Sequence, residues 1–176
     1  MNQNDNNYEE ACRAYEARDY EKAYELFYAL ALESDVSCQM NVANMLMHGL
    51  GVSKNEDRAF EWFEQAAINE DKEAQYIHAW FCIQNGDEKE GFKYLELSSK
   101  AEFLDAVYDL AGFYAQGIYG CEKDICKAGN LYEKAVYLGK KEALGNLFSL
   151  KKQEQGLIRA LFYMAKNLSS FSNAVK

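Results

Sequence analysis

The sequence contains no proline in its 176 residues. Because proline removes a backbone donor and clashes with the preceding helical turn, its absence favours long uninterrupted helices and argues against a linker between two domains. The chain also lacks an apolar run of the roughly 18 residues that a membrane-spanning helix needs. Its start, MNQNDNNYEE, lacks the basic and then apolar residues of an export signal. We therefore expect a helical protein of the cytoplasm that does not contact the membrane.

Residues suited to metal binding or catalysis are few and scattered. The two histidines, His48 and His78, have no nearby aspartate or cysteine in a triad or metal-site pattern. Of the five cysteines, Cys121 and Cys126 are spaced C-x-x-x-x-C, without a second ligand pair. We expect reduced thiols, with a disulfide between these two as the alternative. The sequence predicts no cofactor, no metal and no enzyme; a hydrolase using His48 is the alternative from another class.

Basic residues are outnumbered, 19 to 28, which gives a net charge of −9. The imbalance lies in residues 1–100, with 9 basic and 20 acidic residues (net −11), whereas residues 101–176 carry 10 and 8 (net +2). Because such a chain repels a phosphate backbone, we do not expect nucleic-acid binding. A protein partner with a basic surface would complement the charge. The alternative is that acidic helices simply keep the protein soluble.

Small residues recur within stripes of helical period. The first helix of each unit carries Ala11, Ala43, Ala79 or Ala111, and the second carries Ala23, Ala59, Gly91, Ala128 or Ala160. By subtraction, the second-helix positions are 36, 32, 37 and 32 residues apart. A small residue lets two helix axes approach closely. A period of this size predicts an array of helical hairpins that share one core with their neighbours.

The segment HGLGVSKNEDRAFEWFEQAA (His48–Ala67) resembles the signature of Sel-1-like repeats. That signature is a G-x-G-V turn followed by A-x-x-W-x-x-x-A-A, matched here by Gly49, Gly51, Val52, Ala59, Trp62, Ala66 and Ala67. The resemblance covers residues 37–71 and 105–139 best, and residues 8–33 look like the related tetratricopeptide repeat. The resemblance implies an all-helical solenoid that binds other proteins and has no catalytic residues. It also implies that Trp62 has a packing role.

We therefore predict an all-α protein, a right-handed superhelix of about five helix–turn–helix repeats. Residues 8–168 are expected to form this repeat domain, preceded by a disordered segment, residues 1–7, and followed by a frayed tail, residues 169–176. The Sel-1-like resemblance is compatible with a bacterial source.

The first helices of such hairpins are expected to line the concave wall of the superhelix. The candidate binding groove consists of residues on these first helices that lie close to each small residue and share one helix face. They are Tyr15, Met40, Asn44, Met47, His48, Tyr76, Trp80, Ile83, Gln84, Tyr108 and Gln116. Aromatic and methionine side chains suit the binding of a protein or peptide. The alternative is that these side chains fill the core. We expect Trp80 to be exposed and both Trp62 and His78 to be buried.

The predicted function is therefore recognition of a protein or peptide in the concave groove by a monomeric adaptor or scaffold. One alternative is an immunity protein that neutralises a toxin with a basic active site. Another is a structural module that oligomerises through an exposed apolar end.

Overall fold

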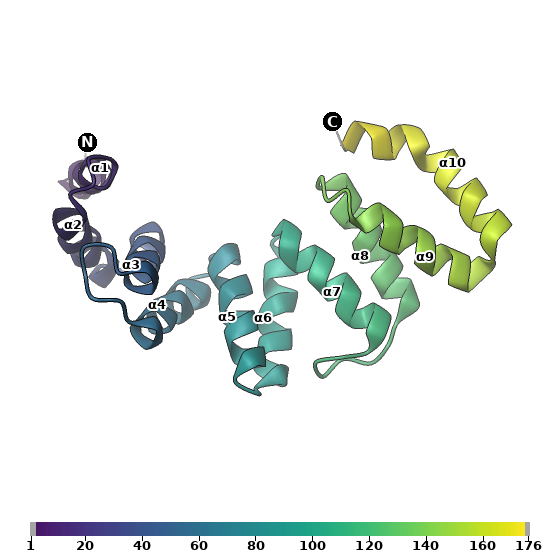
Figure 1. Cartoon of the computed structure of the whole chain (residues 1–176), viewed down its shortest axis with the longest axis horizontal. Coiled ribbons are helices and arrows are strands. Elements are labelled where there is room, and N and C mark those ends of the chain that lie inside the picture. Colours follow the sequence, from purple (N-terminus) through teal and green to yellow (C-terminus); the bar gives the residue numbers. More distant parts are fainter. Residues whose placement is uncertain (1–2, 175–176) are drawn as a thin grey trace. The chain divides into compact units, whose positions relative to one another are not determined.

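The structure, a computed structural model, describes the backbone of residues 3–174. Ten α-helices follow one another along this part of the chain, which contains no strand (Figure 1). They are α1 (Gln3–Glu16), α2 (Tyr20–Leu32), α3 (Val36–His48), α4 (Glu56–Ile68), α5 (Lys72–Gln84), α6 (Glu88–Lys100), α7 (Leu104–Gln116), α8 (Ile125–Tyr137), α9 (Ala143–Gln155) and α10 (Leu157–Ala174). The odd-numbered helices are the first members of the five predicted hairpins, and the even-numbered helices are the second members.

The structure differs from the sequence prediction at both ends. Helix α1 begins at Gln3, so residues 3–7 are helical where disorder is expected. Helix α10 continues to Ala174, beyond the predicted end at residue 168. Residues 1, 2, 175 and 176 lie outside the described part.

Several helices begin at an acidic or amide side chain that accepts a hydrogen bond from the backbone N–H three residues later. The capping residues are Asp19, Asp35, Asn55, Asp71, Asp87 and Asp124, with donor–acceptor distances from 2.7 to 3.4 Å. Such caps satisfy backbone donors that have no partner within the helix. Helices α3 and α7 end at Gly49 and Gly117, whose φ angles of 68° and 72° are left-handed.

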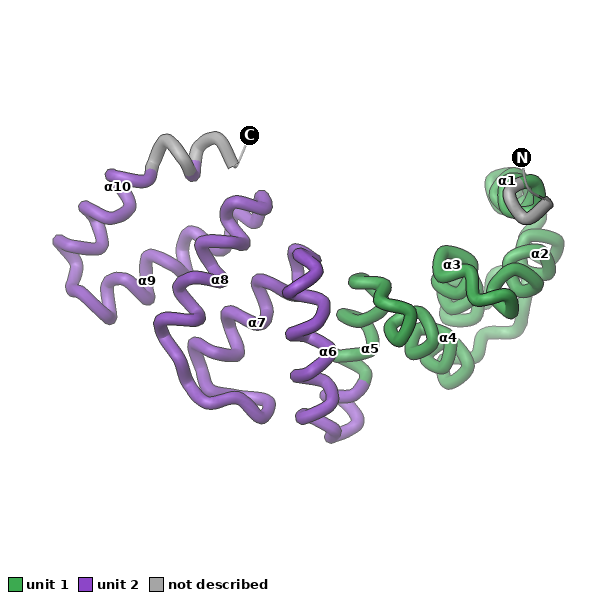
Figure 2. Tube along the Cα trace, turned by 180° about the vertical axis from the view of Figure 1, so that it is seen from behind, with its two compact units in different colours: residues 1–81 green, residues 82–176 purple. Residues whose placement is uncertain are grey.

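The chain divides into two compact units, coloured in Figure 2. Unit 1 ends at Phe81 and unit 2 begins at Cys82, so the boundary falls in the last turn of α5. Within unit 1, α1, α2, α3 and α4 pack against one another in chain order. Within unit 2, α6 to α10 do the same, and α10 also contacts α8.

The small residues that set the repeat period are buried, as predicted. The eight alanines at these positions are 0% exposed, and Gly91 is also buried. Larger side chains complete each core: Phe27, Val42, Leu46 and Phe63 in unit 1, and Leu95, Val107, Val136 and Leu147 in unit 2. The small and the large buried residues therefore have separate roles. The alanines allow the helix axes to approach closely, and the large side chains fill the space between the helices.

Candidate functional site

The candidate groove residues of unit 1 lie on α1, α3 and α5 at repeated positions relative to the buried alanines. On α1, Tyr15 is 41% exposed and its ring contacts Tyr20 edge-on at 5.3 Å between centroids. On α3, Asn44 and His48 are exposed. Met40 and Met47 are half-buried and pack against the core of unit 1. Helix α3 therefore presents two exposed polar side chains beside two half-buried methionines.

Helix α5 contributes an aromatic pair to the same set. The rings of Tyr76 and Trp80 meet edge-on, with centroids 6.5 Å apart and an interplanar angle of 80°. Both side chains are half-buried, so Trp80 is less exposed than the sequence analysis expects. His78, which lies between them in the sequence, is buried as predicted. Half-burial leaves part of each ring available to a partner while the other part fixes its orientation.

The remaining candidates belong to unit 2 and differ in exposure. Gln84 and Gln116 are exposed, whereas Ile83 is buried, with 9% of its surface exposed. Ile83 is therefore a packing residue: it lies four residues after Ala79, and the rest of the protein covers its side chain there. Tyr108 is half-buried and engaged: Asn146 Nδ2 donates to its hydroxyl at 2.9 Å, and the ammonium group of Lys140 lies 5.2 Å from its ring centroid.

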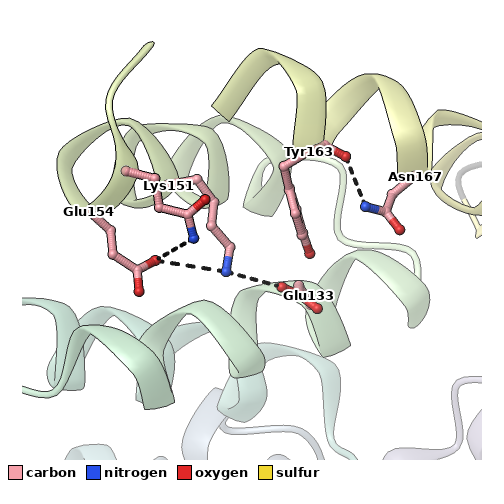
Figure 3. Close-up of polar contacts among 6 residues, drawn as sticks. Glu133, Lys151, Glu154, Tyr163 and Asn167 are labelled. Atoms are coloured by element: carbon pink, nitrogen blue, oxygen red, sulfur yellow. Dashed lines mark hydrogen bonds and ion pairs between the residues drawn. The ribbon is translucent and has the colours of Figure 1, made fainter. Parts of the chain in front are cut away.

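A polar cluster joins the last three helices of unit 2 (Figure 3). Lys151 Nζ of α9 lies 3.6 Å from Glu133 Oε1 of α8 and 4.8 Å from the ring centroid of Tyr163 on α10. Asn167 Nδ2 donates to the backbone oxygen of Tyr163 at 2.8 Å. Burial and a hydrogen bond to Glu133 raise the pKa of Tyr163, so the phenol stays protonated at neutral pH. The cluster therefore attaches α10 to α8 and α9 and offers no activated nucleophile.

The cysteine pair considered in the sequence analysis is not bonded. Cys121 and Cys126 are both free thiols, and Cys121 Sγ donates to the carbonyl oxygen of Ile118 at 3.2 Å. Burial raises the pKa of Cys121, which disfavours the thiolate form. In the part of the chain that the structure describes, no group of three His, Cys, Asp or Glu residues is placed to hold a metal ion. No helix there is long and apolar enough to cross a membrane.

A groove that the sequence analysis missed lies on α6, α7 and α8 of unit 2. Its volume is about 500 Å³, and its lining residues are Lys93, Glu96, Leu97, Ser99, Lys100, Leu110, Leu131 and Lys134. Leucine side chains form its apolar part and three lysines provide its positive charge. The corresponding part of unit 1 contains Trp62, which is half-buried and meets Tyr28 edge-on with ring centroids 5.7 Å apart. Trp62 is thus less buried than expected, although it has the packing role that the resemblance implies.

Comparison with known proteins identifies the repeat. The Sel1 repeat model matches residues 14–35, 36–71, 72–103 and 104–140. No curated protein matches the sequence significantly. Among solved structures, a Sel1 repeat protein from Oxalobacter formigenes aligns with a TM-score of 0.78 and 20% identity, over 93% of this chain and 70% of that one.

Two further structures share the fold at similar identity. A protective antigen of uropathogenic Escherichia coli that displays an SLR fold aligns with a TM-score of 0.66 and 20% identity, over 84% of this chain but 34% of that one. MamA aligns with a TM-score of 0.56 and 17% identity, over 94% and 90% of the two chains. These likenesses confirm the predicted all-α solenoid fold.

Proposed function

Because the chain belongs to the Sel1 repeat family, we propose that it is a non-catalytic protein-binding module, an adaptor or scaffold. The observation that carries this proposal is the repeated presentation of side chains by α1, α3 and α5 in unit 1. Tyr15, Asn44 and His48 are exposed there, beside the half-buried Met40, Met47, Tyr76 and Trp80. We call these seven residues the unit 1 face. Rigid aromatic groups and adaptable methionines beside exposed polar groups are typical of surfaces that bind proteins.

The charge of unit 1 supports a partner with a basic surface. Residues 1–81 include 16 acidic and 6 basic residues, a net charge of −10. Such a charge attracts a positively charged partner and speeds its association at low salt. An inhibitor of a toxin with a basic active site would use the same face. The identity of the partner, rather than the place of binding, separates that role from a scaffold.

Substitution of Asn44 by arginine tests the unit 1 face. Asn44→Arg adds bulk and positive charge at an exposed position, so we expect at least about tenfold weaker partner binding without unfolding. The partner is first identified by affinity capture from the source cells and then purified. Titration calorimetry with the purified partner gives the affinity, and circular dichroism checks the helical content.

The matched control is Gln65→Arg, which introduces the same side chain at an exposed amide position on α4, outside the unit 1 face. It should bind the partner as the unchanged protein does. Trp80→Ala tests the aromatic part of the face and should weaken binding while helical content is retained. Wild-type affinity in both Asn44→Arg and Trp80→Ala would contradict the proposed binding face.

A second candidate function, self-association, is favoured by the exposed apolar side of α10. Leu157, Ile158, Leu161 and Phe162 are 50%, 70%, 52% and 73% exposed. Ile158 and Phe162 lie two residues before and after the buried Ala160. The same offsets in the other hairpins carry exposed and mainly charged residues: Glu21, Asp57, Lys89 and Cys126 before, and Glu25, Glu61, Lys93 and Asn130 after. The exposed apolar side of α10 is thus specific to this helix and is not a general feature of the repeat.

Phe162→Glu tests self-association through α10. Light scattering at two concentrations should show oligomers of the unchanged chain that grow with concentration, and Phe162→Glu should leave monomers, because a buried carboxylate opposes apolar contact. A monomeric wild-type chain at both concentrations would contradict this candidate function and agree with the expected monomer.

A further inference from the structure

We propose that the groove on α6, α7 and α8 is a second docking site, which takes an acidic segment of a protein partner through one large apolar side chain. This site goes beyond the unit 1 face, because it lies within unit 2 and has the opposite charge. The two proposals can therefore fail separately.

The groove exists because two aromatic residues of the first unit have smaller or polar counterparts in the second. Helices α2, α3 and α4 correspond to α6, α7 and α8 when Ala23, Ala43 and Ala59 are aligned with Gly91, Ala111 and Ala128. In this register Glu96 corresponds to Tyr28, and Leu131 corresponds to Trp62. In unit 1 the two rings contact each other, at 5.7 Å between centroids. Their replacement accounts for a hollow of about 500 Å³ in unit 2.

The same comparison shows that positive charge is specific to the second unit. Lys93, Lys100 and Lys134 line the groove, and their counterparts at the same offsets are Glu25, Leu32 and Gln65. The groove lining carries three lysines and one carboxylate, Glu96, for a net charge of +2. This local charge contrasts with the net charge of −9 on the whole chain. Residues 82–176 carry 13 basic and 12 acidic residues, so the negative charge of the chain lies in unit 1. An acidic ligand is therefore attracted to this groove and repelled from unit 1.

The lysines are positioned to receive carboxylates. Lys100 is exposed and makes no ion pair with any residue that the structure describes. Lys93 and Lys134 pair with Glu90 at 2.8 Å and Glu102 at 3.1 Å, and each pair combines one exposed with one half-buried side chain. Ion pairs that water can reach are weak and exchange readily. The single acidic lining residue, Glu96, accepts a hydrogen bond from the hydroxyl of Tyr114 at 3.0 Å. That hydrogen bond holds one carboxylate oxygen of Glu96 against Tyr114, so less of its negative charge faces the groove.

The apolar part of the groove indicates the central residue of the ligand. Leu97, 40% exposed, lies beside Leu110 and Leu131. Trp62 is the counterpart of Leu131 in unit 1, so the repeat can accommodate a tryptophan ring at this position. The volume lies within the range of about 300–1,000 Å³ that is usual for ligand pockets. We therefore assign the groove to a tryptophan or similarly large apolar side chain flanked by aspartate or glutamate.

The experiment measures fluorescence anisotropy of a labelled acidic peptide, DEWED, titrated with the full-length chain. Saturable binding that weakens as salt increases is the expected result. Leu131→Trp fills the groove from within, and Lys100→Glu reverses its unpaired charge, so each should weaken binding at least about tenfold. Lys89→Glu, the same charge reversal at an exposed position of α6 outside the groove, should leave binding unchanged.

Two further peptides separate the apolar and charged parts of the proposal. DEAED, without the aromatic ring, and NQWQN, with the charge removed, should both bind at least about tenfold more weakly than DEWED. The proposal is overturned if wild-type protein shows no saturable binding of DEWED, or if NQWQN binds equally well. It is also overturned if neither groove variant weakens binding. Circular dichroism verifies folding, and Lys100→Glu decides the outcome if Leu131→Trp does not fold.

Discussion

Gly51→Ala is expected to lower the free energy of unfolding by at least about 3 kcal/mol, combining steric overlap with a left-handed backbone. Gly51 has a φ of +66°, and a β-carbon there would overlap the carbonyl group of Tyr20 and lie 2.5 Å from the amide nitrogen of Glu21. These atoms are backbone at the start of α2, so no side-chain rotation relieves the overlap. Urea unfolding followed by circular dichroism measures the loss.

The control for Gly51→Ala is Gly86→Ala, which separates the two contributions. Gly86 has a φ of +87° but no atom within 4 Å of the position that a β-carbon would occupy, so its substitution carries only the backbone penalty. That penalty is about 1–2 kcal/mol. If Gly51→Ala destabilises the protein no more than Gly86→Ala does, the loop after α3 does not lie against the start of α2 as described.

The role of Gly51 illustrates how far the repeat signature goes as a predictor. The sequence identifies Gly49 and Gly51 as a turn, and Gly49 does end α3 in a left-handed conformation. The counterpart of Gly51 two residues after Gly117 is Tyr119, which adopts a φ of 53° despite its side chain. Positive φ therefore does not by itself require glycine here. The requirement at Gly51 comes from the backbone of α2, a contact between distant residues that the local sequence pattern does not contain.

The buried small residues were predictable because their spacing alone carries the information. Alanine at a repeated position on each helix permits close packing, and the structure buries every one of them. The exposure of the intervening positions was less predictable. Tyr15, Met47 and Ile83 each lie four residues after a buried alanine, yet they are exposed, half-buried and buried respectively. Their different exposure depends on neighbouring helices, which helical periodicity does not specify.

The groove of unit 2 shows a different limit. The substitutions of Leu131 for Trp62 and Glu96 for Tyr28 are visible when the repeats are aligned on their small residues. What the sequence does not reveal is that the two aromatic positions contact each other in unit 1. Without that contact the substitutions look like independent surface changes. With it, they predict a hollow, because both sides of one packing contact are lost together.

Leu46→Ala is expected to lower the free energy of unfolding by about 3–5 kcal/mol, the range for a leucine truncated in a closed core. Leu46 lies on α3 and is 0% exposed within the core cluster of unit 1. The comparison is Leu32→Ala, which removes the same atoms from a side chain that is 63% exposed and should cost less than about 1 kcal/mol. Urea unfolding of the two variants measures the difference, and similar losses would contradict the assignment of Leu46 to the core.

Hydrogen exchange should also show where the Leu46→Ala destabilisation acts. Stability in repeat proteins is a sum of terms within repeats and between nearest neighbours, so local openings follow the repeats that lose contacts. We expect amides of α2, α3 and α4 to lose most protection, while those of α8 and α9 retain theirs. Leu147→Ala, at a fully buried position of α9, should give the reverse pattern. An equal loss of protection throughout both units in either variant would instead show that the whole array unfolds as one cooperative body.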